Sequence, residues 1–309
     1  MIATLTLNPS LDRTVTVADL VLEEANRWTS LREDPGGKGI NVSRVVHELG
    51  GETVAYGFIG GTAGETLKRL LRRQGVPFDF TTIKGEIRSN FIITNLKTNR
   101  QTRIDAPGPH VSRQELAELV DKLRSMRTTP DFLVFAGSVP PGIPDDIYRR
   151  LILGAKNYGI KTVLDSDRQW LKEGIKAKPY IIKPNVHETE ELLGMELRDE
   201  ASVIKAAETL VKDDIQIVAI SRGKSGMIVA TREKIIKATP PRVRTRSTVG
   251  AGDSAVAGLV LKLSQGYSLE EACRWAVAAG TAATLTPGTE LCRRKDVERL
   301  LPEVRVEAL

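Results

Sequence analysis

The chain has 309 residues, with 45 lysines and arginines against 39 aspartates and glutamates, and 41% of its residues are hydrophobic. This is ordinary globular composition, and the length suggests two domains or one large α/β domain with an appendage. The two cysteines match neither a disulfide framework nor a zinc site, which predicts a reducing, cytoplasmic setting. The longest charge-free apolar stretch, residues 276–285, is too short to cross a membrane, so we expect neither membrane insertion nor secretion.

The formal net charge of +6 would suit a protein that binds nucleic acid. However, the basic residues are spread along the chain among acidic ones, and only 5% of the residues are aromatic. We therefore expect no nucleic-acid partner. A positive balance also favours small anionic substrates such as phosphates.

Short apolar runs alternate with amphipathic stretches of ten or more residues, a pattern typical of βαβ units. A capping box at Ser112 and Glu115 predicts a helix to about residue 127, and Ser202 is expected to begin another that reaches about residue 212. These elements predict a doubly wound α/β fold with a mainly parallel sheet flanked by helices. The expected buried strands are residues 2–7, 53–58, 132–136, 162–165, 180–183 and 217–221.

Two regions depart from this alternation, since residues 14–31 and 90–104 show period-two patterns without intervening helices. They predict a small β-sheet lid inserted in two pieces, about 13–34 and 88–106. No linker or repeat stands out, so we expect a single α/β domain over residues 1–309 that carries this lid.

The most informative segment is residues 247–254, Ser-Thr-Val-Gly-Ala-Gly-Asp-Ser, followed by an apolar stretch of helical length. Glycines before a helix let backbone N–H groups converge, and the helix N-terminus adds partial positive charge, so the segment favours an anion hole. Asp253 would place a proton acceptor beside that hole, as phosphoryl transfer to an alcohol requires. One alternative is a purely structural helix cap. Another is a dinucleotide fingerprint, for which too few residues follow Gly250.

A second glycine cluster, residues 35–41, leads into a helical pattern at 42–49. It is either a turn with Asn41 as helix N-cap, or a place where a polyhydroxylated ligand approaches the backbone and binds Lys38 and Asn41. Asp12 lies just beyond the carboxyl end of the first strand, where it is either a turn former or an acceptor for sugar hydroxyls.

Together these segments resemble the ribokinase-like (PfkB) carbohydrate kinase family over essentially the whole chain. Residues 247–254 match its C-terminal signature and residues 36–42, Gly-Gly-Lys-Gly-Ile-Asn-Val, its N-terminal one. The Thr-Leu-Asn-Pro-x-x-Asp opening and the segments 137–142 and 183–188 look like its hexose-phosphate branch. Residues 247–292 look closest to the minor bacterial 6-phosphofructokinases, whereas Asn26-Arg27 and Lys38 look more like 1-phosphofructokinases and tagatose-6-phosphate kinases.

The resemblance implies an ATP- and Mg²⁺-dependent kinase in which Asp253 is the catalytic base and the backbone of Gly250, Ala251 and Gly252 forms the anion hole. It implies a homodimer joined through the lid, with a phosphosugar and ATP as small-molecule partners. The sugar and its phosphate would be bound by Asp12, Gly36, Gly37, Lys38, Asn41, Ser138, Arg88, Arg103 and Arg27. The ATP site would comprise Lys183, Asn185, Ser221, Gly223, Gly226 and Ser247.

Asn185 and Glu188 would support Mg²⁺ through water, and K⁺ would bind the backbone carbonyls of Val249, Ala283 and Gly288. Glu290, however, stands where the minor 6-phosphofructokinases have a basic residue beside that potassium site. We expect fructose-6-phosphate as the acceptor, giving fructose-1,6-bisphosphate. Fructose-1-phosphate and tagatose-6-phosphate are the alternatives, and an NAD(P)-binding dehydrogenase built on residues 250–255 is a distant one.

Overall fold

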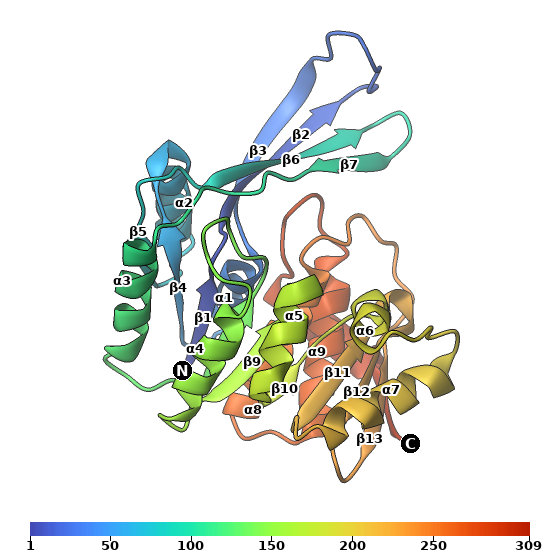
Figure 1. Cartoon of the computed structure of the whole chain (residues 1–309). Helices are drawn as coiled ribbons and strands as arrows, with labels where there is room; N and C mark the ends of the chain where they lie inside the picture. The colour runs from blue at the N-terminus through green and yellow to red at the C-terminus, as the bar shows by residue number, and fades with distance from the viewer.

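The computed structural model describes all residues, 1–309, and its largest element is a ten-stranded sheet in the order β14-β13-β12-β11-β10-β9-β8-β1-β4-β5 (Figure 1). Every pairing from β11 through β10, β9, β8, β1 and β4 to β5 is parallel, and the last three strands at the other edge are antiparallel. The expected mainly parallel α/β fold is confirmed. The strands are β1 Ile2–Thr6, β4 Thr53–Ile59, β5 Phe78–Thr82, β8 Phe132–Ala136, β9 Lys161–Asp165, β10 Ile181–Ile182, β11 Ile217–Ser221, β12 Met227–Ala230, β13 Ile235–Thr239 and β14 Arg305–Ala308.

Helices cover both faces of this sheet, which explains why strands such as β1 and β8 are buried throughout rather than on alternate residues. One face packs on α1 Lys38–Glu48, α8 Ala251–Ser264, α9 Leu269–Ala283 and α10 Arg294–Leu300. The other packs on α3 Arg113–Arg124, α4 Ile147–Lys156, α5 Arg168–Gly174, α6 Val186–Leu193 and α7 Glu200–Lys212. Helix α2, Gly61–Arg73, lies against a smaller core with Leu11 and Ile40, and short 3₁₀ turns occupy Ile175–Ala177, Gly223–Ser225 and Leu301–Glu303.

The helix starts show where local sequence rules succeed and fail. Ser112 caps α3 through the expected capping box with Glu115. In contrast, α7 is capped by Asp199, one turn before Ser202, because an aspartate side chain accepts the free amide equally well. Helix α1 begins at Lys38 directly after Gly37, so Asn41 is not its N-cap and its side chain is free for other contacts.

A second, four-stranded sheet in the order β3-β2-β6-β7 projects from one end of the body (Figure 1). We call this sheet the lid. Its strands are β2 Ser10–Val17, β3 Trp28–Gly36, β6 Arg88–Asn95 and β7 Arg100–Ile104, so they fall in the two segments expected from the period-two patterns, with the first slightly wider. None of the helices combines the length and apolar composition needed to span a bilayer.

Candidate active site

A large cavity, about 1080 Å³, lies where several parallel strands end. In open α/β sheets, ligands bind beyond the carboxyl ends of the strands, and this cavity follows that rule because Asp165 ends β9 and Lys183 follows β10. Ten of the predicted site residues line it. They are Lys38, Lys183, Asn185, Glu188, Ser221, Gly223, Gly226, Ala251, Gly252 and Asp253.

Asp253 lies in the first turn of α8, where the helix amides have no partner within the helix. The preceding Gly250 has φ +76°, and a Cβ there would come within 2.4 Å of a methyl group of Leu291. Only glycine fits this turn, which brings the backbone of Ala251 and Gly252 to the cavity wall. The segment therefore has the geometry of an anion hole with a carboxylate beside it.

The carboxylate of Asp253 is buried and accepts a hydrogen bond from Asn41 Nδ2 at 2.8 Å. Burial, together with the negative charge of Asp165, raises the pKa of Asp253 to about 6, while Lys38, Asn41 and Lys183 oppose the rise. A carboxylate with this pKa is ionised at neutral pH yet basic enough to take a proton.

Asp165 is an acidic residue of the site that sequence reasoning missed. Its Oδ1 lies 3.1 Å from Lys38 Nζ and 3.6 Å from Lys183 Nζ, and its buried Oδ2 has no partner. Burial alone would raise the pKa of Asp165. The positive charges of Lys183 and Lys38 nevertheless hold this pKa below its ordinary value. Its position as last residue of a predicted buried strand was the available signal, since that edge of the sheet binds ligands.

Also at the cavity wall, Asn185 and Glu188 form a reciprocal capping box at the start of α6, with both bonds 2.8 Å long. Lys224 and Arg242 also line the cavity and add positive charge that the motifs did not indicate. Ser247 does not line it, because its buried hydroxyl donates to the carbonyl of Gly288 at 2.8 Å.

The predicted sugar-binding residues gather where the lid joins the body. Asp12 Oδ1 accepts from Ser10 Oγ at 2.7 Å and from Asn90 Nδ2 at 2.9 Å, and burial raises the pKa of its carboxyl group. Gly36 lies against this carboxylate, since a Cβ there would be 2.5 Å from it. The adjoining Gly37 leads into α1 with φ +113°.

The predicted phosphate-binding cations differ in their surroundings. Arg88 is half-buried and donates to the carbonyls of Asn8 and Ala106, while Ser138 accepts from Asn8 Nδ2 at 3.2 Å. Arg103 is exposed and bonded to Asp105 at 2.7 Å, although its charge still reaches Asp12. Arg27 is exposed just before β3, and none of these residues lines the large cavity.

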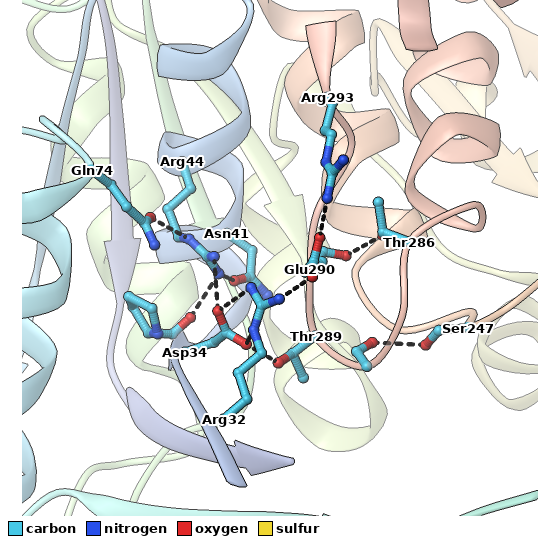
Figure 2. A network of polar contacts seen from close by, with 12 residues as sticks. Arg32, Asp34, Asn41, Arg44, Gln74, Ser247, Thr286, Thr289, Glu290 and Arg293 are labelled. Carbon is cyan, nitrogen blue, oxygen red and sulfur yellow. Dashed lines mark hydrogen bonds and ion pairs between the residues drawn. The ribbon is translucent and has the colours of Figure 1, made fainter. Parts of the chain in front are cut away.

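The three carbonyl positions predicted for K⁺ lie near the loop that follows α9. The carbonyl of Ala283 accepts a hydrogen bond from Thr286 Oγ1 at 2.8 Å. The hydroxyl of Ser247 donates to the carbonyl of Gly288 and accepts from the amide of Val249 at 3.3 Å. Glu290, in the same loop, pairs with Arg32 of the lid and with Arg293 (Figure 2).

A glycine-rich helix N-terminus with a buried carboxylate, facing a lysine-lined cavity, is the arrangement of an α/β enzyme that transfers phosphoryl groups to alcohols. The model of the pfkB family carbohydrate kinases matches residues 5–296. The chain belongs to this family.

The chain is similar to the 1-phosphofructokinase of Bacillus subtilis, with 35% identity over 309 residues that cover 100% of both chains. It is also similar to the ATP-dependent 6-phosphofructokinase isozyme 2 of Escherichia coli, with 36% identity over 301 residues and 97% of each chain covered. The crystal structure of phosphofructokinase-2 from Escherichia coli in complex with substrates and products matches with a TM-score of 0.94, at 36% identity and 98% coverage of both chains. The chain is therefore an ATP-dependent hexose-phosphate kinase.

Proposed function

We propose that the enzyme transfers the γ-phosphoryl group of ATP to a hydroxyl of fructose-6-phosphate, forming fructose-1,6-bisphosphate and ADP. The observation that carries this is the buried carboxylate of Asp253 at the N-terminus of α8, between Asn41 and the cavity that holds Lys38 and Lys183. Asp253 takes the proton as the hydroxyl oxygen bonds to the γ-phosphorus and the bond to ADP breaks. The amides of residues 250–252 and the two lysines offset the charge on the transferred group.

The choice of sugar depends on which end of the hexose reaches Asp253. Fructose-6-phosphate and tagatose-6-phosphate differ only at C4, and both present a free 1-hydroxyl together with a 6-phosphate. One site can deliver that hydroxyl from either sugar, and a contact to the other hydroxyls, for which Asp12 is suited, would discriminate between them. Fructose-1-phosphate must instead bind with its phosphate where the 6-phosphate otherwise lies.

Fructose-1-phosphate is the second candidate, and the specific observation in its favour is the full-length similarity to the Bacillus subtilis 1-phosphofructokinase. Lys38 among the glycines and Asn26-Arg27 in the lid favour it too, and favour tagatose-6-phosphate equally. A coupled assay across the three sugar phosphates decides. We expect activity with both 6-phosphates, the highest kcat/KM with fructose-6-phosphate, and fructose-1-phosphate at least about tenfold poorer. A highest kcat/KM with fructose-1-phosphate would overturn the choice of sugar but not the kinase class.

The donor set of the nucleotide cavity fits a magnesium ion held through water. Glu188 is half-buried and uses Oε2 for the Asn185 amide, which leaves Oε1 available, and burial raises the pKa of its carboxyl group. Oxygen ligands and retained waters are what Mg²⁺ prefers. When bound, the ion would offset charge on the phosphates of ATP. Asn185 and Glu188 would hold its waters.

A potassium ion fits the carbonyls of Val249, Ala283 and Gly288 less fully. The Ala283 carbonyl already accepts bonds from both the hydroxyl and the amide of Thr286, and the Gly288 carbonyl accepts one from the hydroxyl of Ser247, so of these two only Gly288 keeps a free lone pair. Glu290 in the same loop is already paired with Arg32 and Arg293. We expect at most a modest increase in kcat when K⁺ replaces Na⁺ at constant ionic strength, measured with saturating substrates.

The lid supports assembly into a homodimer. Large apolar side chains that are exposed in the single chain lie on its strands or in the segments that join them: Val21, Leu22, Trp28, Leu31, Leu96 and Ile104. A solvent-facing sheet with such side chains is typical of an interface. Light scattering should give twice the mass of one chain, and Trp28→Glu should shift it towards the monomer. A wild-type protein that stays monomeric at micromolar concentration would contradict the dimer.

Both cysteines are free and buried, and burial raises the pKa of each thiol to about 12. Thiols with such a pKa are inert at neutral pH, and nothing in their placement suits a disulfide. This supports a cytoplasmic location for the enzyme.

A further inference from the structure

Arg44 is a buried arginine of α1 that connects the candidate base to the lid. Its Nη1 donates to Asn41 Oδ1 at 3.1 Å and to the carbonyl of Pro35 at 2.9 Å. Its Nε donates to Gln74 Oε1 at 2.9 Å, and its Nη2 lies 3.7 Å from Asp34 Oδ1 (Figure 2). Nε and both donors of Nη1 are thus used within the protein, and Nη2 faces the carboxylate of Asp34 as an ion pair.

The chemistry of arginine fixes which way the Asn41 amide faces. A guanidinium group has donors only, so the atom of Asn41 that meets it must be the carbonyl oxygen. The NH₂ group of Asn41 is then turned to the other side, where it donates to Asp253 Oδ2 at 2.8 Å. Without Arg44, the carbonyl end of the amide loses its partner, so the side chain of Asn41 is held at the Asp253 end only and its bond to the carboxylate is less well fixed.

Asp34 supplies the charge that allows an arginine to be buried here. It is the lid carboxylate that pairs with Arg44, and it lies two residues before the end of β3. It also accepts from Thr289 Oγ1 at 2.7 Å and from Arg32 Nε at 2.8 Å. Burial alone would raise the pKa of Asp34. The hydrogen bonds from Arg32 and the charge of Arg44 nevertheless hold this pKa below its ordinary value.

We propose that Arg44 and Asp34 are positioning residues, which fix the amide of Asn41 towards the catalytic base and thereby link Asp253 to strand β3 of the lid. The proposal rests on the role of Asp253 given above. Neither Arg44 nor Asp34 lines the cavity, so neither is a catalytic residue. Movement of β3, which carries Asp34, would therefore act on Asp253 through the side chains of Arg44 and Asn41.

Besides Arg44 itself, whose charge also interacts with Asp253, the charged groups that face Asp253 come from three elements: Lys38 on α1, Asp165 on β9, and Lys183 after β10. None of these three residues touches Asn41 through a hydrogen bond, so they remain in place when Arg44 is replaced. Because the Asn41 bond favours the ionised carboxylate, its loss raises the pKa of Asp253 and moves the acid limb of the kcat profile to higher pH.

The test uses the double variant Arg44→Met/Asp34→Asn, which removes both charges and avoids leaving one buried and unpaired. Folding is checked by circular dichroism, and ATP affinity by calorimetry. We expect ATP affinity within about twofold of wild type, kcat lowered about tenfold or more, and the acid limb raised by about one pH unit. The matched control is Arg13→Met, which breaks the half-buried lid pair with Glu33 and should leave ATP affinity, kcat and the acid limb unchanged.

A double-mutant cycle with Asn41→Ala identifies the route of the effect. If Arg44 acts through Asn41, its replacement produces no further shift of the acid limb once Asn41 is alanine. Independent, additive shifts would overturn the proposal, as would a folded Arg44→Met/Asp34→Asn variant with wild-type kcat and pH profile. The variant Asp253→Asn, assayed alongside, separates this proposal from the assignment of Asp253 as the base. If Asp253→Asn keeps high turnover, the assignment of the base fails. If Asp253→Asn is inactive while the Arg44 variants behave as wild type, only the positioning role of Arg44 and Asp34 fails.

Discussion

Lys38 and Asp165, 127 residues apart in the chain, form an ion pair with Nζ 3.1 Å from Oδ1. The carboxylate also lies 3.6 Å from Lys183, so one acidic group orients two cations at the cavity wall. The carboxylates of Asp165, Glu188 and Asp253 raise the pKa of Lys38, although burial alone would lower it. The lysine is therefore charged whenever the enzyme works.

Replacing Asp165 by asparagine should destabilise the protein and also alter its pH profile. Lys38 and Lys183 would lose their counter-charge, which should lower the free energy of unfolding by up to about 3 kcal/mol. This is the low end of the range for breaking a buried ion pair, because Lys38 is partly exposed. The charge that raises the pKa of Asp253 would be gone too, so the acid limb of kcat should move to lower pH. Urea unfolding and a pH–rate profile measure both effects. The control is Asp121→Asn, an exposed surface change, and an unchanged unfolding free energy for Asp165→Asn would contradict the role of the pair.

Asp253→Asn should leave folding and ATP binding intact while lowering turnover by about 10²–10⁴, the usual range for a lost general base. The isosteric amide keeps the shape of the first turn of α8 but cannot accept a proton. Turnover is measured with saturating ATP and sugar phosphate, and ATP binding by calorimetry. Retention of more than a tenth of wild-type turnover would rule out Asp253 as the base.

The pH dependence of both activity and stability follows from the pKa of Asp253, raised from 3.8 to about 6. Because the ionised form is the base, kcat should fall about tenfold per pH unit below about 6. The free energy of unfolding changes with pH in the opposite direction. A carboxyl group whose pKa is raised by folding stabilises the protein most below pH 3.8, and this stabilisation is lost as the pH rises through about 6. Unfolding free energies at pH 4, 5, 6 and 7 for wild type and Asp253→Asn isolate this contribution. A difference between the two proteins that does not vary with pH would contradict it.

Arg88→Ala should raise the KM for the sugar phosphate about 10- to 150-fold and change kcat less, since a charge-assisted hydrogen bond contributes about 1.5–3 kcal/mol. Arg88 already holds the carbonyls of Asn8 and Ala106, so thermal unfolding must show that the variant is folded at the assay temperature. Arg13→Ala, on the neighbouring strand, is the control. An unchanged KM would move the phosphate site elsewhere, with Arg103 as the next candidate.

Periodicity and motif spacing were sufficient to predict the α/β class, the parallel strands and the segments that form the lid. They were insufficient for β12 to β14, whose antiparallel pairing depends on the edge of a completed sheet rather than on local pattern. The N-cap of α7 was missed because Asp199 and Ser202 both qualify locally, and only the register of the whole helix separates them.

For the site, glycine motifs identified the backbone that approaches the cavity, because such turns require particular residues. Asp165 was missed, since a single aspartate at a strand end has no local signature. The Asn41–Asp253 and Arg44–Asp34 contacts were missed for a related reason, because they join segments that only the folded sheet brings together.

The scattering of the site along the chain has a consequence for the way the enzyme acquires activity. The base lies on α8, and its hydrogen-bond partner Asn41 is 212 residues earlier, with the strands that carry Asp165 and Lys183 in between. Contacts between such distant segments form late, because each requires the closure of a long loop. During refolding from urea, helical signal should therefore recover well before turnover does. A nascent chain that has not yet exposed α8 on the ribosome has no proton acceptor, and so cannot consume ATP before its lid and core are complete.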